Sequence, residues 1–379
     1  MLRHHPLSLP AGLARGPRPP SNPVPGPAAG GRAGGVARRG LAAVLACALH
    51  FAASAQSQGA DPPSDAPRAA DAGKPIPEEL KRFNGAVVRV DARAVSGAPS
   101  ADALGARRTG SGVVISERLV LTIGYLLLET ENVEVVTSGG RRIPASVAGY
   151  DHATGFGLVR TVLPLDVRPL ELGDSDKVAE RQKVLTLGQG EPAATELYVI
   201  SRKPFAGGWE YLLDRPIYTF PPVNNWSGAA LITEDGKLVG IGSLIVNDAA
   251  SDRRGVPGNL FVPVNLLKPI LDDLLASGRR RGPVQPWLGM TTEMVRGHLM
   301  VVRVSHNGPA EGAGIDQGDI VMAVGGERVA DQADFYRRLW KLGPAGTEVV
   351  LRVLKGGDVR DMKLRSVDRM DVLFKPSGI

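Results

Sequence analysis

Cysteine is almost absent from this sequence. The 379 residues include one, Cys47, so the chain cannot form an internal disulfide or a zinc site built on several thiolates. The histidines beyond residue 55, which are His152, His298 and His306, are scattered and have no ligand spacing. The glycine-rich stretch 188–190 lacks the lysine and the third glycine of phosphate-binding loops. We therefore predict no metal and no cofactor.

An excess of charge of one sign is also lacking once the first residues are set aside. The formal net charge is +6, but residues 1–55 hold six arginines and no acidic residue. Removing these six from the 45 basic residues leaves 39, against 39 acidic residues. Because binding to nucleic acid relies on a basic surface, this balance predicts no nucleic-acid partner.

The sequence also lacks an apolar run long enough for a membrane-spanning helix, which needs roughly 20 apolar residues. The apolar run 40–55 follows Arg38 and Arg39 and ends in the small residues Ala-Ser-Ala, a pattern typical of signal-peptide cleavage. We predict that residues 1–55 are a cleaved leader that exports the chain to the periplasm or another extracytoplasmic space. Two alternatives stay open: a lipid anchor on Cys47, and an uncleaved leader that holds the chain in the membrane.

Glycine and proline are plentiful, at 47 and 30 residues, while aromatic residues make up 5%. This composition favours a turn-rich β protein with some linker. Residues 56–82 read as a disordered linker, with a short helix at 77–83, and residues 83–278 as an all-β unit of short strands separated by turns. The expected strands are 86–91, 110–115, 119–122, 132–136, 142–150, 157–161, 183–187, 197–201, 209–213, 217–220, 229–232, 238–245 and 258–263.

A helix is predicted at 264–277, where leucine and isoleucine recur on one stripe, and a charged hinge follows at 279–283. Residues 284–370 form a second unit of strands and helices, and residues 371–379 a tail. In this second unit we expect strands at 289–296, 299–305, 320–324 and 348–354, a helix beginning near Pro309, and another at 331–342.

The first unit resembles the trypsin-like domain of HtrA/Deg-family serine proteases. Its landmarks, in the family's order, are Gly-Ser-Gly-Val-Val-Ile at 110–115, Pro-Leu-Glu-Leu-Gly-Asp-Ser-Asp at 169–176, Ser-Gly at 227–228, Asp-Gly-Lys-Leu-Val-Gly-Ile at 235–241 and Phe-Val-Pro-Val at 261–264. The resemblance implies a mainly β fold, with two six-stranded β-barrels.

The second unit resembles a PDZ domain of the same family. Trp-Leu-Gly-Met at 287–290 is similar to the carboxylate-binding loop of such domains, and Gly-Pro-Ala-Glu-Gly-Ala-Gly-Ile at 308–315 and Gly-Asp-Ile-Val at 318–321 are similar to their most recognisable run. The resemblance implies an α+β PDZ domain after the barrels.

The resemblance places the nucleophilic serine of the family at Ser227, but the rest of the catalytic triad is replaced. The family's histidine follows a Leu-Thr pair by three residues, and Tyr125 stands there. The family's aspartate follows a threonine, and Gly155 stands there. Serine attack needs a base, and a tyrosine with a pKa near 10 is a poor one at neutral pH. We therefore expect a degenerate triad.

The resemblance puts the oxyanion hole at the backbone amides of Asn225 and Ser227, with the bulky Trp226 refilling the pocket. His152 precedes the missing aspartate, on the wrong segment for a base. We interpret it as an exposed turn histidine, with assistance to Ser227 as the less favoured alternative.

The PDZ resemblance implies a groove for an extended peptide that adds a strand to the sheet edge. The amides of Leu288, Gly289 and Met290 would receive the terminal carboxylate. The strand from Met290 to Met294 would pair with the peptide, and Phe335 and Leu339 on the helix predicted at 331–342 would line the opposite side of the groove. The alternative is that these apolar residues only pack in the core.

Our leading hypothesis is an exported, HtrA-like pseudoprotease that binds carboxyl termini or unfolded apolar segments, as an adaptor, regulator or holdase in protein quality control. The alternative is an active serine endopeptidase that uses Ser227 with a non-standard base. The resemblance also suggests a homotrimer or an assembly with an active homologue.

Overall fold

The computed structural model describes residues 83–190 and 193–373. The predicted leader, the predicted linker with its short helix, and the end of the predicted tail lie outside these residues, except for Phe83. Within the described ranges, no helix is long and apolar enough to cross a membrane.

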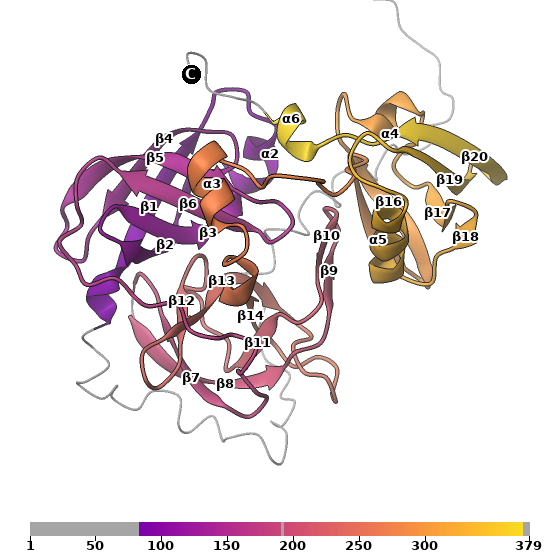
Figure 1. The fold of residues 1–379 in the computed structure, drawn as a ribbon. Helices are drawn as coiled ribbons and strands as arrows, with labels where there is room; N and C mark the ends of the chain where they lie inside the picture. The colour runs from indigo at the N-terminus through magenta and orange to yellow at the C-terminus, as the bar shows by residue number, and fades with distance from the viewer. Residues whose placement is uncertain (1–82, 191–192, 374–379) are drawn as a thin grey trace, which may run out of the picture. The chain divides into compact units, whose positions relative to one another are not determined.

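The first part of the described chain forms a closed antiparallel barrel (Figure 1). Its strands are β1 (Val87–Ala94), β2 (Arg107–Ser116), β3 (Leu119–Ile123), β4 (Thr130–Val136), β5 (Arg142–Tyr150) and β6 (Phe156–Thr161). They follow one another around the barrel as β1-β2-β3-β6-β5-β4, and pairing of β1 with β4 closes it.

A second closed barrel follows in the chain. Its strands are β7 (Lys183–Leu187), β8 (Ala194–Ser201), β11 (Ile217–Phe220), β12 (Ala230–Ile232), β13 (Leu238–Val246) and β14 (Gly258–Pro263). The order is β11-β14-β13-β12-β7-β8, and β11 pairs with β8 to close it. A separate two-stranded hairpin, β9 (Phe205–Gly207) and β10 (Tyr211–Leu213), is inserted between β8 and β11.

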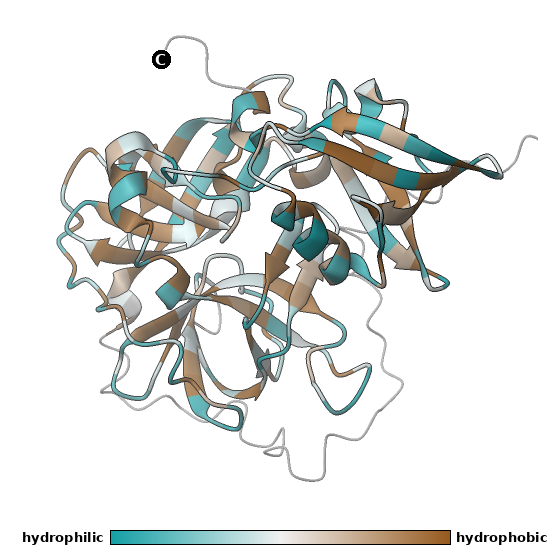
Figure 2. Ribbon diagram, turned by 45° about the vertical axis from the view of Figure 1, so that its right-hand side comes forward, coloured by the Kyte–Doolittle hydropathy of each residue, from teal (hydrophilic) through white to brown (hydrophobic). Residues whose placement is uncertain are grey.

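The strand sequences explain these barrels. β1 reads Val-Val-Arg-Val-Asp-Ala-Arg-Ala, and its side chains largely alternate between buried and less buried, as a strand with one face in a core requires. β3 reads Leu-Val-Leu-Thr-Ile and is buried throughout. Figure 2 shows hydrophobic stretches along the strands, in brown. The two six-stranded barrels match the predicted fold class.

The carboxy-terminal part forms an antiparallel sheet in the order β15-β16-β17-β19-β20, with β18 paired to β17. Its elements are β15 (Met290–Val295), β16 (His298–Val304), α4 (Pro309–Gly312), β17 (Ile320–Val324), β18 (Glu327–Arg328), α5 (Gln332–Lys341), β19 (Glu348–Lys355) and β20 (Asp358–Arg365). α5 begins where the Asp331 carboxylate accepts a hydrogen bond from the Asp334 amide, and it buries Phe335, Tyr336 and Leu339.

The helix predicted at 264–277 is wrong in its first half. The structure has a 3-10 turn, η5 (Val264–Leu266), and the α-helix α3 (Leu271–Ser277) starts only later. Pro269 explains the break, because proline lacks an amide hydrogen and its ring clashes with the preceding helical turn. The end at Gly278, which adopts φ +74°, is as predicted.

The strand predicted at 209–213 is also partly wrong. Trp209 and Glu210 lie in the turn of the hairpin, and only β10 remains of that strand. The prediction missed β9, because Phe-Ala-Gly is too short for a periodic pattern. The other elements that it missed are α2 (Ser100–Leu104), β18, β20, α6 (Arg369–Val372) and the 3-10 turns η3 (Asn84–Ala86) and η4 (Gly124–Leu127).

Arg202 is buried at 9% exposure, between the end of β8 and the hairpin. Its guanidinium donates to four backbone carbonyl oxygens at 2.7–3.1 Å, those of Ser175, Val178, Arg215 and Pro216. The side chain therefore ties the segment after the inserted hairpin to the segment before β7.

We predict that Arg202→Leu lowers the free energy of unfolding by about 2–4 kcal/mol, because buried carbonyl groups lose their donor. Arg160→Leu is the control, since Arg160 is exposed on β6, and its effect should stay within about 0.5 kcal/mol. Urea denaturation measures both. Equal effects of the two substitutions would contradict the role of Arg202.

Candidate functional site

Ser227 lies in the loop between β11 and β12, and it is partly exposed. Its carbonyl oxygen accepts a hydrogen bond from the Ser111 amide at 2.7 Å, and the Gly228 amide donates to the Gly242 carbonyl at 2.9 Å. Gly228 adopts φ +73°, and a Cβ atom there would lie 2.0 Å from the Ser111 oxygen. Only glycine fits this position, so the Ser-Gly pair has a structural reason beside any catalytic one.

Tyr125 lies on η4 (Gly124–Leu127), directly after β3. Its hydroxyl oxygen is 2.8 Å from Ser227 Oγ and 3.1 Å from the Ser243 carbonyl oxygen. The indole Nε1 of Trp226 donates to the same Ser243 oxygen at 3.2 Å. The structure thus brings Tyr125 and Ser227 together, with Trp226 packed beside them.

The chemistry of this pair depends on the protonation of Tyr125. Burial raises the pKa of Tyr125 to about 12, although hydrogen bonding to Ser227 and Trp226 opposes the shift. The phenol is therefore protonated at neutral pH. A protonated phenol can donate a hydrogen bond to a serine hydroxyl but cannot remove its proton.

Gly155 lies between β5 and β6 with φ +79°, and its carbonyl accepts from the Gly124 amide at 2.7 Å. A Cβ atom at Gly155 would lie 2.8 Å from the Tyr211 hydroxyl and 3.3 Å from the ring. That hydroxyl donates to the Thr154 carbonyl at 2.7 Å. The space that an aspartate would need is therefore filled by Tyr211, a residue that the sequence did not single out.

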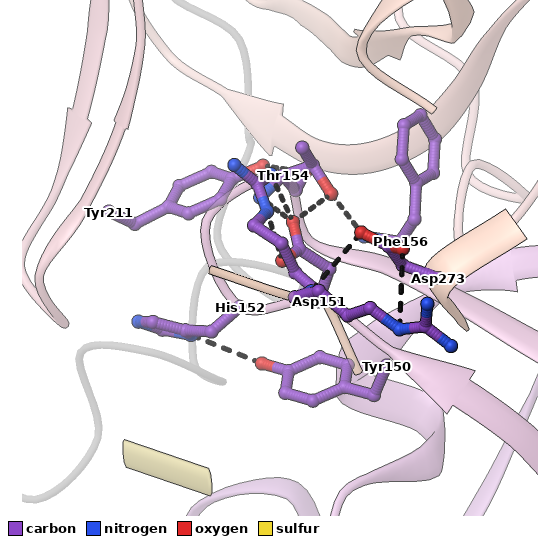
Figure 3. A network of polar contacts seen from close by, with 9 residues as sticks. Tyr150, Asp151, His152, Thr154, Phe156, Tyr211 and Asp273 are labelled. Carbon is purple, nitrogen blue, oxygen red and sulfur yellow. Dashed lines mark hydrogen bonds and ion pairs between the residues drawn. The ribbon is translucent and has the colours of Figure 1, made fainter. Parts of the chain in front are cut away.

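Asp151 is near in sequence to Gly155, but its carboxylate is already engaged (Figure 3). It accepts from the Thr154 amide at 2.9 Å and hydroxyl at 2.7 Å, and from the Arg280 guanidinium at 3.0–3.1 Å. These contacts tie the turn before β6 to the segment after α3.

His152 is neither the exposed turn histidine that we expected nor a partner of Ser227. Its Nδ1 is 3.1 Å from the Tyr150 hydroxyl (Figure 3), and its ring nitrogens are 2.9–3.0 Å from Nη1 of Arg369. Burial, helped by the positive charge of Arg369, lowers the pKa of His152 well below 6.5. Residues distant in sequence enclose the ring, which the local sequence could not reveal.

The oxyanion assignment involves Asn225 and Ser227. Asn225 packs against Gly188 at the end of β7, where a Cβ atom would lie 2.7 Å from the Asn225 carbonyl oxygen and 2.9 Å from its Nδ2. This contact sets the position of the loop before the serine. The use of the two amides as an oxyanion hole stays a prediction.

The amides of Leu288, Gly289 and Met290 converge on one carboxylate, that of Glu210 in the β9–β10 turn. The distances from the amide nitrogens to the nearer carboxylate oxygen are 2.9 Å, 3.0 Å and 3.3 Å, respectively. Gly289 adopts φ +80°, which turns the chain so that successive amides point the same way. The sequence had suggested the three amides but not Glu210.

The side chains proposed for the groove differ in exposure. Phe335 and Leu339 are fully buried and Met290 is 3% exposed, all within the core of the carboxy-terminal sheet. Met294 is 42% exposed. Ala206 and Leu212 of the hairpin also pack against this core.

Within the described ranges, no three His, Cys, Asp or Glu side chains are placed to hold a metal ion.

We predict that protonation of His152 destabilises the fold. A histidine with a depressed pKa in the folded state contributes stability above its unfolded pKa, near 6.5, and that stability is lost as the pH falls below this value. Below that pH the wild type should lose about 1.4 kcal/mol per pH unit more than His152→Gln, which cannot take up a proton.

Urea denaturation from about pH 8 to about pH 5 measures this difference. His298→Gln is the matched control, because His298 is exposed on β16. Parallel pH profiles for the wild type and His152→Gln would contradict the prediction.

Each of the two structural parts, the barrels and the carboxy-terminal sheet, matches a known protein family. Residues 110–241 match the family model of a trypsin-like peptidase domain, and residues 286–365 match that of a PDZ domain. These matches confirm the predicted fold class of a trypsin-like double barrel followed by a PDZ domain.

Relatives at 25–28% identity are bacterial proteases. A probable periplasmic serine protease do/HhoA-like of Haemophilus influenzae is 28% identical over 281 residues, covering 68% of this chain and 58% of that protein. The serine protease Do-like HtrA of Lactobacillus helveticus is 26% identical, with 68% of each chain covered. The periplasmic pH-dependent serine endoprotease DegQ of Escherichia coli K12 is 25% identical, covering 76% of this chain and 63% of that one.

The chain thus spans less than two thirds of the length of the Haemophilus and Escherichia relatives. By its two domain matches, the chain carries a trypsin-like peptidase domain followed by a PDZ domain, and it is similar to bacterial serine proteases of the HtrA/Deg type.

Proposed function

We propose that this chain is an exported HtrA-like protein that has lost proteolysis and binds peptides through its PDZ groove. The observation that carries the first half is the hydrogen bond of 2.8 Å between Tyr125 and Ser227, in which a protonated phenol stands where a base is required. Removing any member of a catalytic triad leaves only about 10³–10⁴-fold acceleration over water. Two members are replaced here, and their losses overlap because a triad acts as a unit.

The refilled aspartate site adds to this argument. Tyr211 occupies the space beside Gly155, so the site is rebuilt rather than merely emptied. A rebuilt site is what we expect of a scaffold kept for something other than hydrolysis. The relatives are named serine proteases, which keeps an active endopeptidase with a non-standard base as the second candidate.

The peptide-binding half of the proposal rests on the loop at Leu288, Gly289 and Met290. Its three amides hold a carboxylate within 2.9–3.3 Å, which is the chemistry needed for the carboxyl terminus of a peptide. The clients would be exposed carboxyl termini or unfolded apolar segments, and the role that of an adaptor, regulator or holdase. Export, and assembly as a homotrimer or with an active homologue, stay parts of the proposal.

We predict that a fluorophosphonate probe labels the wild type no faster than Ser227→Ala, because such probes react quickly only with an activated serine. Labelling is read by gel fluorescence, with trypsin as the positive control for the probe. Rapid labelling of the wild type that disappears in Ser227→Ala would overturn the proposal of lost proteolysis and favour the active endopeptidase.

We predict that Tyr125→His combined with Gly155→Asp does not restore labelling, because the new Cβ atom would lie 2.8 Å from the Tyr211 hydroxyl. Adding Tyr211→Ala opens that space, and the triple variant should label roughly tenfold faster or more than the double variant. Circular dichroism establishes that both variants are folded, and Ser227→Ala in the triple background should abolish the gain. Equal labelling of the folded double and triple variants would show that Tyr211 is not the obstacle.

A further inference from the structure

Glu210 is a buried carboxylate that the proposed chemistry of Ser227 does not use. Glu210 is 3% exposed, and its carboxylate accepts hydrogen bonds from the backbone amides of Leu288, Gly289 and Met290. These are the amides assigned to the terminal carboxylate of a bound peptide. The side chain of one hairpin residue therefore occupies the defining subsite of the groove.

The backbone of the hairpin tip occupies the adjoining part of the groove. The Thr292 amide on β15 donates to the Gly208 carbonyl at 3.0 Å, and the Tyr336 hydroxyl on α5 donates to the Gly207 carbonyl at 2.8 Å. The Glu210 amide lies 3.1 Å from the same Tyr336 oxygen. A peptide added as a strand on β15 would need the Thr292 amide, which the hairpin already uses.

The approach of the hairpin to β15 is close enough to require glycine. A Cβ atom at Gly208 would lie 2.8 Å from the Thr292 carbonyl oxygen and 3.0 Å from Cγ2 of Thr291. Behind the tip, Ala206 and Leu212 pack against the core that contains Phe335. The hairpin thus meets the groove through backbone, side-chain carboxylate and apolar contacts together.

Glu210 also adopts a backbone conformation that disfavours it. Its φ is +62°, in the left-handed region that glycine and asparagine adopt more readily than glutamate. Such a conformation persists where the surroundings hold it, and it often marks a site of function. Here the surroundings that hold it are the loop amides and Tyr336, which lie in the carboxy-terminal unit.

The charge of the docked carboxylate is not fully compensated. Burial raises the pKa of Glu210 to about 7, although the three amides and the positive charge of Arg369 oppose this shift. The amides and Arg369 therefore offset only part of the effect of burial on this carboxylate.

We propose that the β9–β10 hairpin is an internal ligand of the PDZ groove, with the Glu210 carboxylate in the place of a peptide's carboxyl terminus. Peptides with a free carboxyl terminus bind only when the hairpin has left. The competition with peptides rests on the proposed function, whereas the docking of the hairpin does not. The occupant is the chain's own hairpin rather than that of a second copy.

Two measurements on the full chain test this proposal. Hydrogen–deuterium exchange reports protection of the amides in the segment 287–290 without any peptide. Fluorescence polarisation reports binding of a labelled peptide that ends in three valines with a free carboxylate, and the same peptide amidated at its end is the specificity control.

Glu210→Gly removes the carboxylate and suits the left-handed turn. It should raise the exchange rate of the segment and tighten binding of the free-carboxylate peptide by about tenfold or more, as expected when a competing docked state is removed. Gly208→Val keeps the carboxylate but blocks the approach to β15, and it should act in the same direction. Asp166→Gly is the matched control, an exposed acidic residue with φ +52° that should change neither readout.

Unchanged exchange and unchanged peptide binding in both hairpin variants would overturn the proposal, while peptide binding by all forms would leave the proposed function intact. Faster exchange without binding of the peptide by any form would support the docked hairpin and count against peptide capture. Protection that vanishes on dilution of the protein would show that a second copy supplies the hairpin, and would overturn the intramolecular assignment.

Discussion

The hydrogen bond from the Ser111 amide to the Ser227 carbonyl oxygen, at 2.7 Å, links a strand of the first barrel to the serine loop of the second. The same Ser111 residue offers its carbonyl to the Thr122 hydroxyl at 2.6 Å, so β2, β3 and the serine loop meet at one point. Gly228 is required there because no Cβ atom fits against the Ser111 oxygen. The serine loop is thus held by backbone geometry that does not depend on catalysis.

That constraint holds the shape of the site whichever side chains surround Ser227. Tyr125 takes the place next to Ser227 and uses its hydroxyl to satisfy Ser227 and Ser243. Tyr211 fills the space beside Gly155 and satisfies the Thr154 carbonyl. Each tyrosine maintains packing and hydrogen bonding there, and neither supplies a carboxylate. Buried polar groups are costly to leave without a hydrogen-bond partner, and the two tyrosine hydroxyls supply such partners here.

Tyr211 also connects the two sites. It belongs to β10, and the turn that precedes it carries Glu210 to the loop at Leu288. One short hairpin therefore contributes the tyrosine that fills the space beside Gly155 and the carboxylate that the amides of the loop at Leu288 bind. Arg202, which precedes this hairpin, donates to the carbonyls of Arg215 and Pro216 after it, and this limits where the base of the hairpin can move.

The sequence alone determined most of the strands and the fold class, a double barrel followed by a PDZ domain, because alternation of apolar residues and family motifs are local patterns. It misjudged the helix before Gly278, where Pro269 outweighed the apolar stripe, and the hairpin, whose strands are too short to show a period. Only the tertiary structure decided that Tyr211 fills the space at Gly155, that His152 is enclosed by Tyr150 and Arg369, and that Glu210 reaches the PDZ loop. Each of these contacts except that with Tyr150 joins residues more than 50 positions apart, and such contacts depend on how the barrels and the hairpin fold together, which no local pattern encodes.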